Sequence, residues 1–232
     1  DEILEATSTN SVTMLDGLLY VATGKGVMIY DGKMERVYNA LTEGTADKRV
    51  RALLNDGKGN VWAAGNYIGA IRYNPEKDEL TSFTEDNGMP DNTGRNLTLL
   101  KDGSMAVGCS AGLAIIDGDN VTKYTKDDGL EQPVILCVLE GENGTIYAGS
   151  DGKGIYEIRD GSVIHHGVSE GLEDLVILRM TADPETGGIF VGGGSHAYYW
   201  DMKEFKALDN FKKQAGSIFD IKVTEGRLWI MQ

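Results

Sequence analysis

Two glycine-rich stretches have a residue spacing that could bind a nucleotide phosphate. Asn55–Gly65 reads NDGKGNVWAAG, and Glu140–Gly154 reads EGENGTIYAGSDGKG. Glycine-rich loops cradle nucleotide phosphates when a strand precedes the loop and a helix follows it. Here the first loop is followed by VWAAG, whose residues favour another strand. The sequence therefore predicts hairpin turns in which glycine supplies a positive φ, and not a nucleotide site.

Acidic pairs are a second group of chemically capable side chains. Glu85–Asp86, Asp127–Asp128 and Glu173–Asp174 could serve sugar hydrolysis or bind calcium. The three pairs recur at one position of a 42-residue repeat, which favours a role in turn formation and solvation. Ligand or calcium contact and catalysis are the alternatives.

Histidine and cysteine chemistry finds little support in the sequence. His165 and His166 are neighbours in a predicted strand, so they point to opposite faces and cannot chelate one ion; we expect both at the surface. No Gly-x-Ser-x-Gly elbow, zinc spacing or cysteine–histidine nucleophile arrangement occurs. We therefore expect no catalytic residue, no metal and no cofactor.

The charge balance narrows the possible partners. The 232 residues include 36 acidic and 22 basic side chains, which gives a net charge of -14. Nucleic acids and anionic membrane surfaces attract basic proteins, so we expect neither to be a direct partner.

An internal repeat provides the elements that must position these side chains. Short apolar runs such as LLYVATG, NVWAAG and TIYAG recur along the whole chain. The matched aromatic or apolar positions are Tyr20, Trp62, Met105, Tyr147, Phe190 and Trp229. Successive positions lie 42, 43, 42, 43 and 39 residues apart. Such a regular spacing indicates an array of one structural unit.

Each repeat contains four strand-like runs of four to six residues, separated by hairpin-length turns. Four short antiparallel strands in about 42 residues are typical of a blade of a β-propeller. We expect an all-β fold with about five and a half blades, as part of a propeller of six to eight. The predicted blades cover residues 7–47, 48–92, 93–133, 134–175 and 176–215, with a partial blade at 216–232.

The repeat also resembles a known family. The second unit reads VRALLNDGKGNVWAAGNYIGAIRYNPEKDELTSFTEDNGMPDN, and the loop that ends it returns as TKDDGLEQP and VSEGLEDL. This pattern resembles the two-component-regulator propeller repeats and covers essentially the whole chain. WD40 repeats match less well, because Trp200–Asp201 is the only Trp-Asp pair.

The resemblance implies an extracytoplasmic ligand-binding sensor, in the periplasm or at the cell surface, that often recognises oligosaccharides. Proteins of this family are anchored in the membrane and carry histidine kinase or diguanylate cyclase output domains. The resemblance implies no enzymatic activity in this segment. The alternatives are a protein-interaction scaffold, including a homodimer, and less favourably a propeller lyase or glycosidase.

Propeller topology places the candidate ligand-binding residues. The loops between blades and the loops between second and third strands lie on one face, where propeller ligands commonly bind. The candidates on this face are Arg51, Asn66, Tyr67, Arg95, Asp151 and His196. Aromatic, amide and charged groups of this kind suit sugar recognition. An alternative is that Arg51 and Arg95 only pair with nearby loop carboxylates. Arg179 and Asp220 occupy equivalent positions of two inner strands and could also pair.

Overall fold

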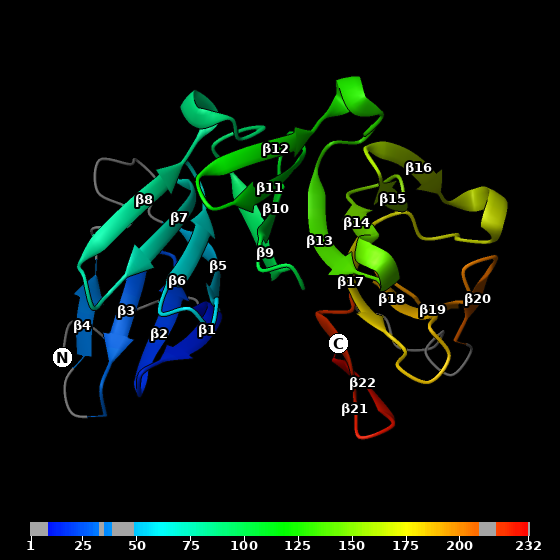
Figure 1. Cartoon of the computed structure of the whole chain (residues 1–232). Coiled ribbons are helices and arrows are strands. Elements are labelled where there is room, and N and C mark those ends of the chain that lie inside the picture. Colours follow the sequence, from blue (N-terminus) through cyan, green and yellow to red (C-terminus); the bar gives the residue numbers. More distant parts are fainter. Residues whose placement is uncertain (1–8, 33–34, 39–48, 209–216, 232) are drawn as a thin grey trace. The chain divides into compact units, whose positions relative to one another are not determined.

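The computed structural model describes residues 9–32, 35–38, 49–208 and 217–231. The chain divides into two compact units, residues 1–123 and 124–232, and each is described by itself. Figure 1 shows the first unit from blue to green and the second from green to red.

The first unit consists of three four-stranded antiparallel sheets. The first sheet contains β1 (Thr9–Leu15), β2 (Leu18–Thr23), β3 (Gly26–Tyr30) and β4 (Glu35–Tyr38). The second contains β5 (Val50–Asn55), β6 (Val61–Gly65), β7 (Gly69–Asn74) and β8 (Glu79–Phe83). The third contains β9 (Gly94–Leu99), β10 (Met105–Cys109), β11 (Leu113–Asp117) and β12 (Asn120–Tyr124). In each sheet the strands are paired in sequence order.

The second unit repeats this arrangement. One sheet contains β13 (Ile135–Glu140), β14 (Ile146–Ser150), β15 (Ile155–Arg159) and β16 (Ser162–His166). The next contains β17 (Ile177–Ala182), β18 (Ile189–Gly193), β19 (Ala197–Trp200) and β20 (Phe205–Ala207). A two-stranded sheet of β21 (Asp220–Thr224) and β22 (Arg227–Met231) follows.

The second strand of each complete blade forms the core. All five residues of β6, β10 and β14 are buried, and each of these strands has a paired strand on both edges. In the first unit Trp62 packs in a cluster with Phe83, Met105 and Val107. Four of the repeated positions of the sequence, Tyr20, Trp62, Met105 and Tyr147, are thus buried in the blades, whereas Phe190 is partly buried and Trp229 is 58 % exposed.

The connections between blades contain short 3₁₀ turns. These are η2 (Glu85–Asn87), η3 (Lys126–Asp128) and η5 (Val168–Glu170), and η4 (Glu142–Gly144) lies within a blade. In η3 the backbone N–H of Thr125 donates to the Asp128 carboxylate at 2.8 Å, and Gly129 ends the turn with φ 109°. One residue of an acidic pair therefore stabilises its turn, as the sequence favoured.

The chain has the β-propeller fold predicted from the repeat, with blades of four antiparallel strands. The helical elements of the described residues are short 3₁₀ turns, and no α-helix occurs among them. None of these elements is long and apolar enough to cross a membrane. The predicted blade limits remain predictions, and those at residues 47/48 and 215/216 lie outside the described residues.

Candidate functional site

A β-bulge at the start of the first strand of each complete blade determines how the predicted arginines are presented. In β5, Val50 pairs with Gly65 and Ala52 pairs with Ala64, so Arg51 is the extra residue. The same register shift recurs in the other complete blades, at Asn10, Arg95, Leu136 and Leu178. A bulge leaves one residue outside the ladder and turns its side chain away from the regular alternation. Each complete blade therefore presents one such side chain at equivalent places.

Arg51 is held by the loop between β6 and β7. Its Nε donates to the Asn66 side-chain oxygen at 2.7 Å. The Asn66 backbone N–H in turn donates to the carbonyl of Arg49 at 3.0 Å. The next residue, Tyr67, is 64 % exposed and has φ 60°. A bulky side chain in this region of φ is a rare and strained arrangement that often occurs at functional sites. Arg51, Asn66 and Tyr67 therefore form one cluster.

Arg95 repeats the same arrangement in the next blade. Its Nε donates to the Ser110 hydroxyl at 2.9 Å, across the same 15-residue separation that joins Arg51 to Asn66. Burial raises the pKa of the nearby Asp91 carboxyl, although the charge of Arg95 and hydrogen bonds from Thr93 and Ser110 oppose the shift. Each arginine thus donates a hydrogen bond to a neutral side chain of its own blade.

Asp151 and His196 belong to the second unit. Asp151 is exposed, and its backbone N–H donates to the Val134 carbonyl at 2.9 Å. The His196 ring nitrogen Nδ1 lies 2.9 Å from the Ser195 hydroxyl, which also lies 3.0 Å from an Asp174 carboxylate oxygen. The bulge residues of this unit are leucines, so it lacks the arginine arrangement of blades two and three. The gathering of all six predicted residues around one channel stays a prediction.

The structure tests two other expectations about the second unit, the Arg179–Asp220 pairing and the exposure of His166. Arg179 and Asp220 approach each other, with 4.0 Å between Nε and the carboxylate, so the predicted pairing is confirmed. The expectation that His166 lies at the surface is wrong. Its side chain is only 15 % exposed, because it packs against Trp200 and contacts the Glu157 carboxylate at 3.0 Å. Trp200 belongs to the next blade, so strand alternation alone does not reveal this contact.

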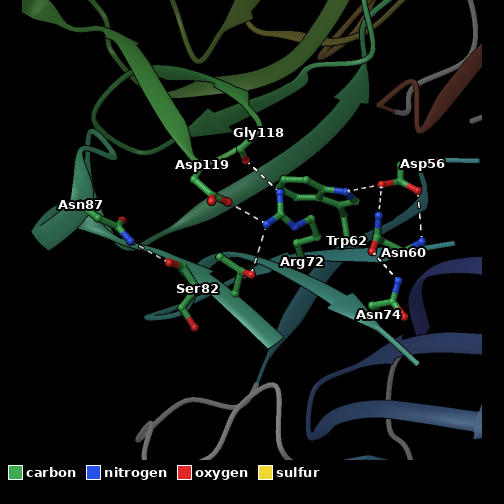
Figure 2. Close-up of polar contacts among 10 residues, drawn as sticks. Asp56, Asn60, Trp62, Arg72, Asn74, Ser82, Asn87, Gly118 and Asp119 are labelled. Carbon is green, nitrogen blue, oxygen red and sulfur yellow. Dashed lines mark hydrogen bonds and ion pairs between the residues drawn. The ribbon is translucent and has the colours of Figure 1, made fainter. Parts of the chain in front are cut away.

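The opposite end of β5 carries a polar network that the sequence analysis did not identify as a site. Asp56 is buried and accepts hydrogen bonds from the backbone N–H groups of Lys58 and Asn60, the Asn60 amide and the Trp62 indole N–H. Asn74 then donates to Asn60 at 3.1 Å. Figure 2 shows this chain of contacts beside the Trp62 ring. It explains the NDGKGN stretch, since Gly57 and Gly59, with φ 69° and 85°, shape the hairpin turn that holds Asp56. The hairpin prediction is confirmed.

Arg72 forms the other side of this region and joins two blades. Its guanidinium carbon lies 5.8 Å from the Trp62 ring centroid. One Nη atom donates to the Gly118 carbonyl at 2.9 Å and the other to the Asp119 carboxylate at 2.8 Å (Figure 2). A pocket of about 410 Å³ lies here, between blades two and three of the first unit. An Asp-x-x-x-Asn-x-Trp spacing could have indicated the network, but its meaning depends on the hairpin geometry.

Metal and thiol chemistry have no candidate residues in the described ranges. No group of three or more His, Cys, Asp or Glu side chains is placed there to hold a metal ion. Cys109 and Cys137 are both buried and unpaired with each other. Burial raises the pKa of the Cys137 thiol to about 12, so neither its position nor its protonation suits a nucleophile.

Comparisons with known proteins support the fold. No family model and no curated protein sequence matches the chain. Solved structures do match, and one is the extracellular domain of BT3049 from B. thetaiotaomicron, assigned to a hybrid two-component system. It has a TM-score of 0.79 and 20% identity over 96% of this chain and 32% of its own length. The extracellular domain of BT4673 from the same organism, assigned to a one-component system, gives a TM-score of 0.72 and 20% identity over 96% and 31%.

Virginiamycin B lyase from Staphylococcus aureus is also similar, with a TM-score of 0.69 and 13% identity over 88% of this chain and 70% of the lyase. At these identities the likeness establishes the β-propeller fold. The chain spans about a third of the length of the two extracellular domains. Those two domains are the kind of protein that the repeat pattern of the sequence resembles.

Proposed function

We propose that this chain is a non-catalytic, ligand-binding sensor module of a bacterial signalling protein, located outside the cytoplasm. The proposal is supported by its similarity to extracellular domains of signalling systems and by the repeat pattern, which resembles the same class. In the proposed parent protein, a membrane anchor and a kinase or cyclase output domain accompany the propeller. Ligand binding would shift the population between two arrangements of the parent protein, because the ligand has different affinities for them.

The ligand that we propose is an oligosaccharide held by blades two and three. The observation that carries this proposal is Tyr67, an exposed aromatic side chain at φ 60° beside the Arg51–Asn66 hydrogen bond. An exposed aromatic face provides area for a sugar ring, and the arginine forks of Arg51 and Arg95 donate to hydroxyl or carboxylate oxygens. Asp151 and His196 belong to the second unit and remain predicted ligand contacts of their own blades.

A thermal-shift screen of the chain against a panel of glycans and polysaccharide fragments tests this function. We expect at least one oligosaccharide to raise the unfolding temperature, because a ligand that binds only the folded state stabilises it. Arg95→Gln should reduce the shift, while Arg159→Gln, an exposed arginine of the second unit, should leave it unchanged. A folded chain that responds to no member of a broad panel contradicts the sensor proposal.

A further inference from the structure

We propose that the pocket between blades two and three is a second binding site, for a neutral polyhydroxylated molecule of one or two sugar rings. The pocket has a volume of about 410 Å³ and is lined by both blades of the first unit. This volume is within the range of about 300–1,000 Å³ usual for small-molecule sites. Asp56, one of its lining residues, lies five residues along the chain from Arg51, or about 16 Å along an extended strand. The pocket is therefore separate from the Tyr67 cluster.

Two cationic side chains of blade two reach blade three and frame the pocket. Lys58 Nζ donates to the Gly103 carbonyl at 3.3 Å, and Arg72 donates to the Gly118 carbonyl at 2.9 Å. Trp62 and Ile116, both buried, lie among the lining residues. Both bridges end on backbone carbonyls of turns in blade three and connect the two blades that line the pocket.

The inner polar groups are already satisfied and rigid. Asp56 accepts four hydrogen bonds from its own hairpin, and Asn60 and Asn74 bond to each other. Arg72 is paired with Asp119. A network in which every side chain has a hydrogen-bond partner keeps its geometry. Less conformational entropy is then lost when a ligand binds.

The outer groups determine the class of ligand. Lys77, Glu79 and Asp117 also line the pocket, are exposed, and have no side-chain hydrogen bond or ion pair among the described residues. The charged lining residues are three cations (Lys58, Arg72, Lys77) and three anions (Asp56, Glu79, Asp117), so their charges cancel in a chain of net charge -14. Such a lining offers both donors and acceptors. Hydroxyl groups both donate and accept, so a neutral polyol fits this lining better than an anion, a cation or an apolar molecule.

Titration of the whole chain with glucose, galactose, xylose and maltose, followed by NMR, tests the inference. The Trp62 indole N–H and the side-chain amides of Asn60 and Asn74 report on the pocket, and the Tyr67 backbone N–H reports on the other cluster. We expect at least one of these sugars to shift the pocket signals in a saturable way. Lys77→Ala combined with Glu79→Ala should weaken this binding about tenfold, since both remove hydrogen bonds from charged groups. Lys123→Ala combined with Asp86→Ala, two exposed residues of the same unit, should leave it unchanged.

Glucuronate and glycine serve as charged probes in the same experiment. If the pocket signals shift with glucuronate or glycine and with none of the neutral sugars, the proposal of a neutral polyhydroxylated ligand is overturned. Sugar binding that moves only the Tyr67 signal, or no saturable shift of pocket signals in the millimolar range, overturns the second site. Because the two clusters have separate signals, failure of the pocket is distinguishable from failure of the sensor site.

Discussion

At the scale of single residues, Tyr67 has a strained backbone conformation and belongs to the proposed ligand site. A non-glycine residue near φ 60° costs on the order of 1–2 kcal/mol, and asparagine tolerates this region better than tyrosine. The side chain is 64 % exposed, so burial does not repay this cost. We infer that the exposed aromatic ring serves contact with the proposed ligand.

Tyr67→Asn should therefore stabilise the first unit while it weakens ligand binding. We expect an increase of about 0.5–1 kcal/mol in the free energy of unfolding, from relief of the strained backbone. Chemical denaturation followed by the Trp62 indole resonance measures it. A loss of stability would show that the tyrosine makes packing contacts, and would count against its role as a strained ligand contact.

Asp56 is a second residue with a measurable consequence. Burial alone would raise the pKa of its carboxyl, but hydrogen bonds from Asn60, Lys58 and Trp62 outweigh burial and hold the pKa below the ordinary 3.8. Its folded-state pKa is thus lower than its unfolded-state pKa. The ionised carboxylate contributes stability above pH 3.8, and this contribution is lost as the pH falls through the folded pKa.

Two substitutions of Asp56 test the direction of this pH dependence of stability. Asp56→Ala should cost about 2–4 kcal/mol, because it leaves the Trp62 indole and the Asn60 amide without their acceptor. Asp56→Asn keeps the shape and should remove part of the acid-induced loss of stability in the first unit. Unfolding measured between pH 2 and 5 checks both effects, and an unchanged acid dependence in Asp56→Asn would refute the assignment.

At the scale of elements, the turns were predictable and the bulges were not. Gly57 and Gly59 stand where a hairpin requires positive φ, so residue type alone indicated the turn. The bulge at Arg51 shifts the register by one residue, and the apolar run VRALL reads the same with or without that shift. The sequence thus placed Arg51 near the correct loop, while its hydrogen bond to Asn66 depends on the bulge.

Close packing between β7 and β8 of blade two gives an element-scale prediction. A Cβ at Gly69 would lie 2.1 Å from the Phe83 carbonyl oxygen, whereas one at Gly57 would meet nothing within 4 Å. Both glycines have positive φ, 59° and 69°, so both alanine variants carry a similar backbone cost. Gly69→Ala should therefore be destabilising by at least about 2 kcal/mol more than Gly57→Ala. Equal losses in denaturation experiments would mean that the strand has room to move.

At the scale of the whole molecule, the 42-residue period was enough to predict the fold. Six matched positions from Tyr20 to Trp229 fall on second strands of the observed sheets. The pocket at Trp62 was not predicted, because Arg72, Asn74 and Gly118 converge there only after two blades pack together. The Arg179–Asp220 pair could be predicted because the two residues occupy equivalent positions of repeated inner strands, whereas the contact of Arg72 with Gly118 has no counterpart in the repeat.

Calorimetric titration with the oligosaccharide that gives the largest thermal shift tests the central claim, which is recognition without chemistry at the Tyr67 cluster. Tyr67→Ala should weaken binding about tenfold through loss of the aromatic contact, and Tyr30→Ala, another exposed tyrosine, should bind as the unaltered chain does. The oligosaccharide should be recovered intact after incubation. Equal affinity of the Tyr67→Ala variant, or a cleaved oligosaccharide, would contradict the account.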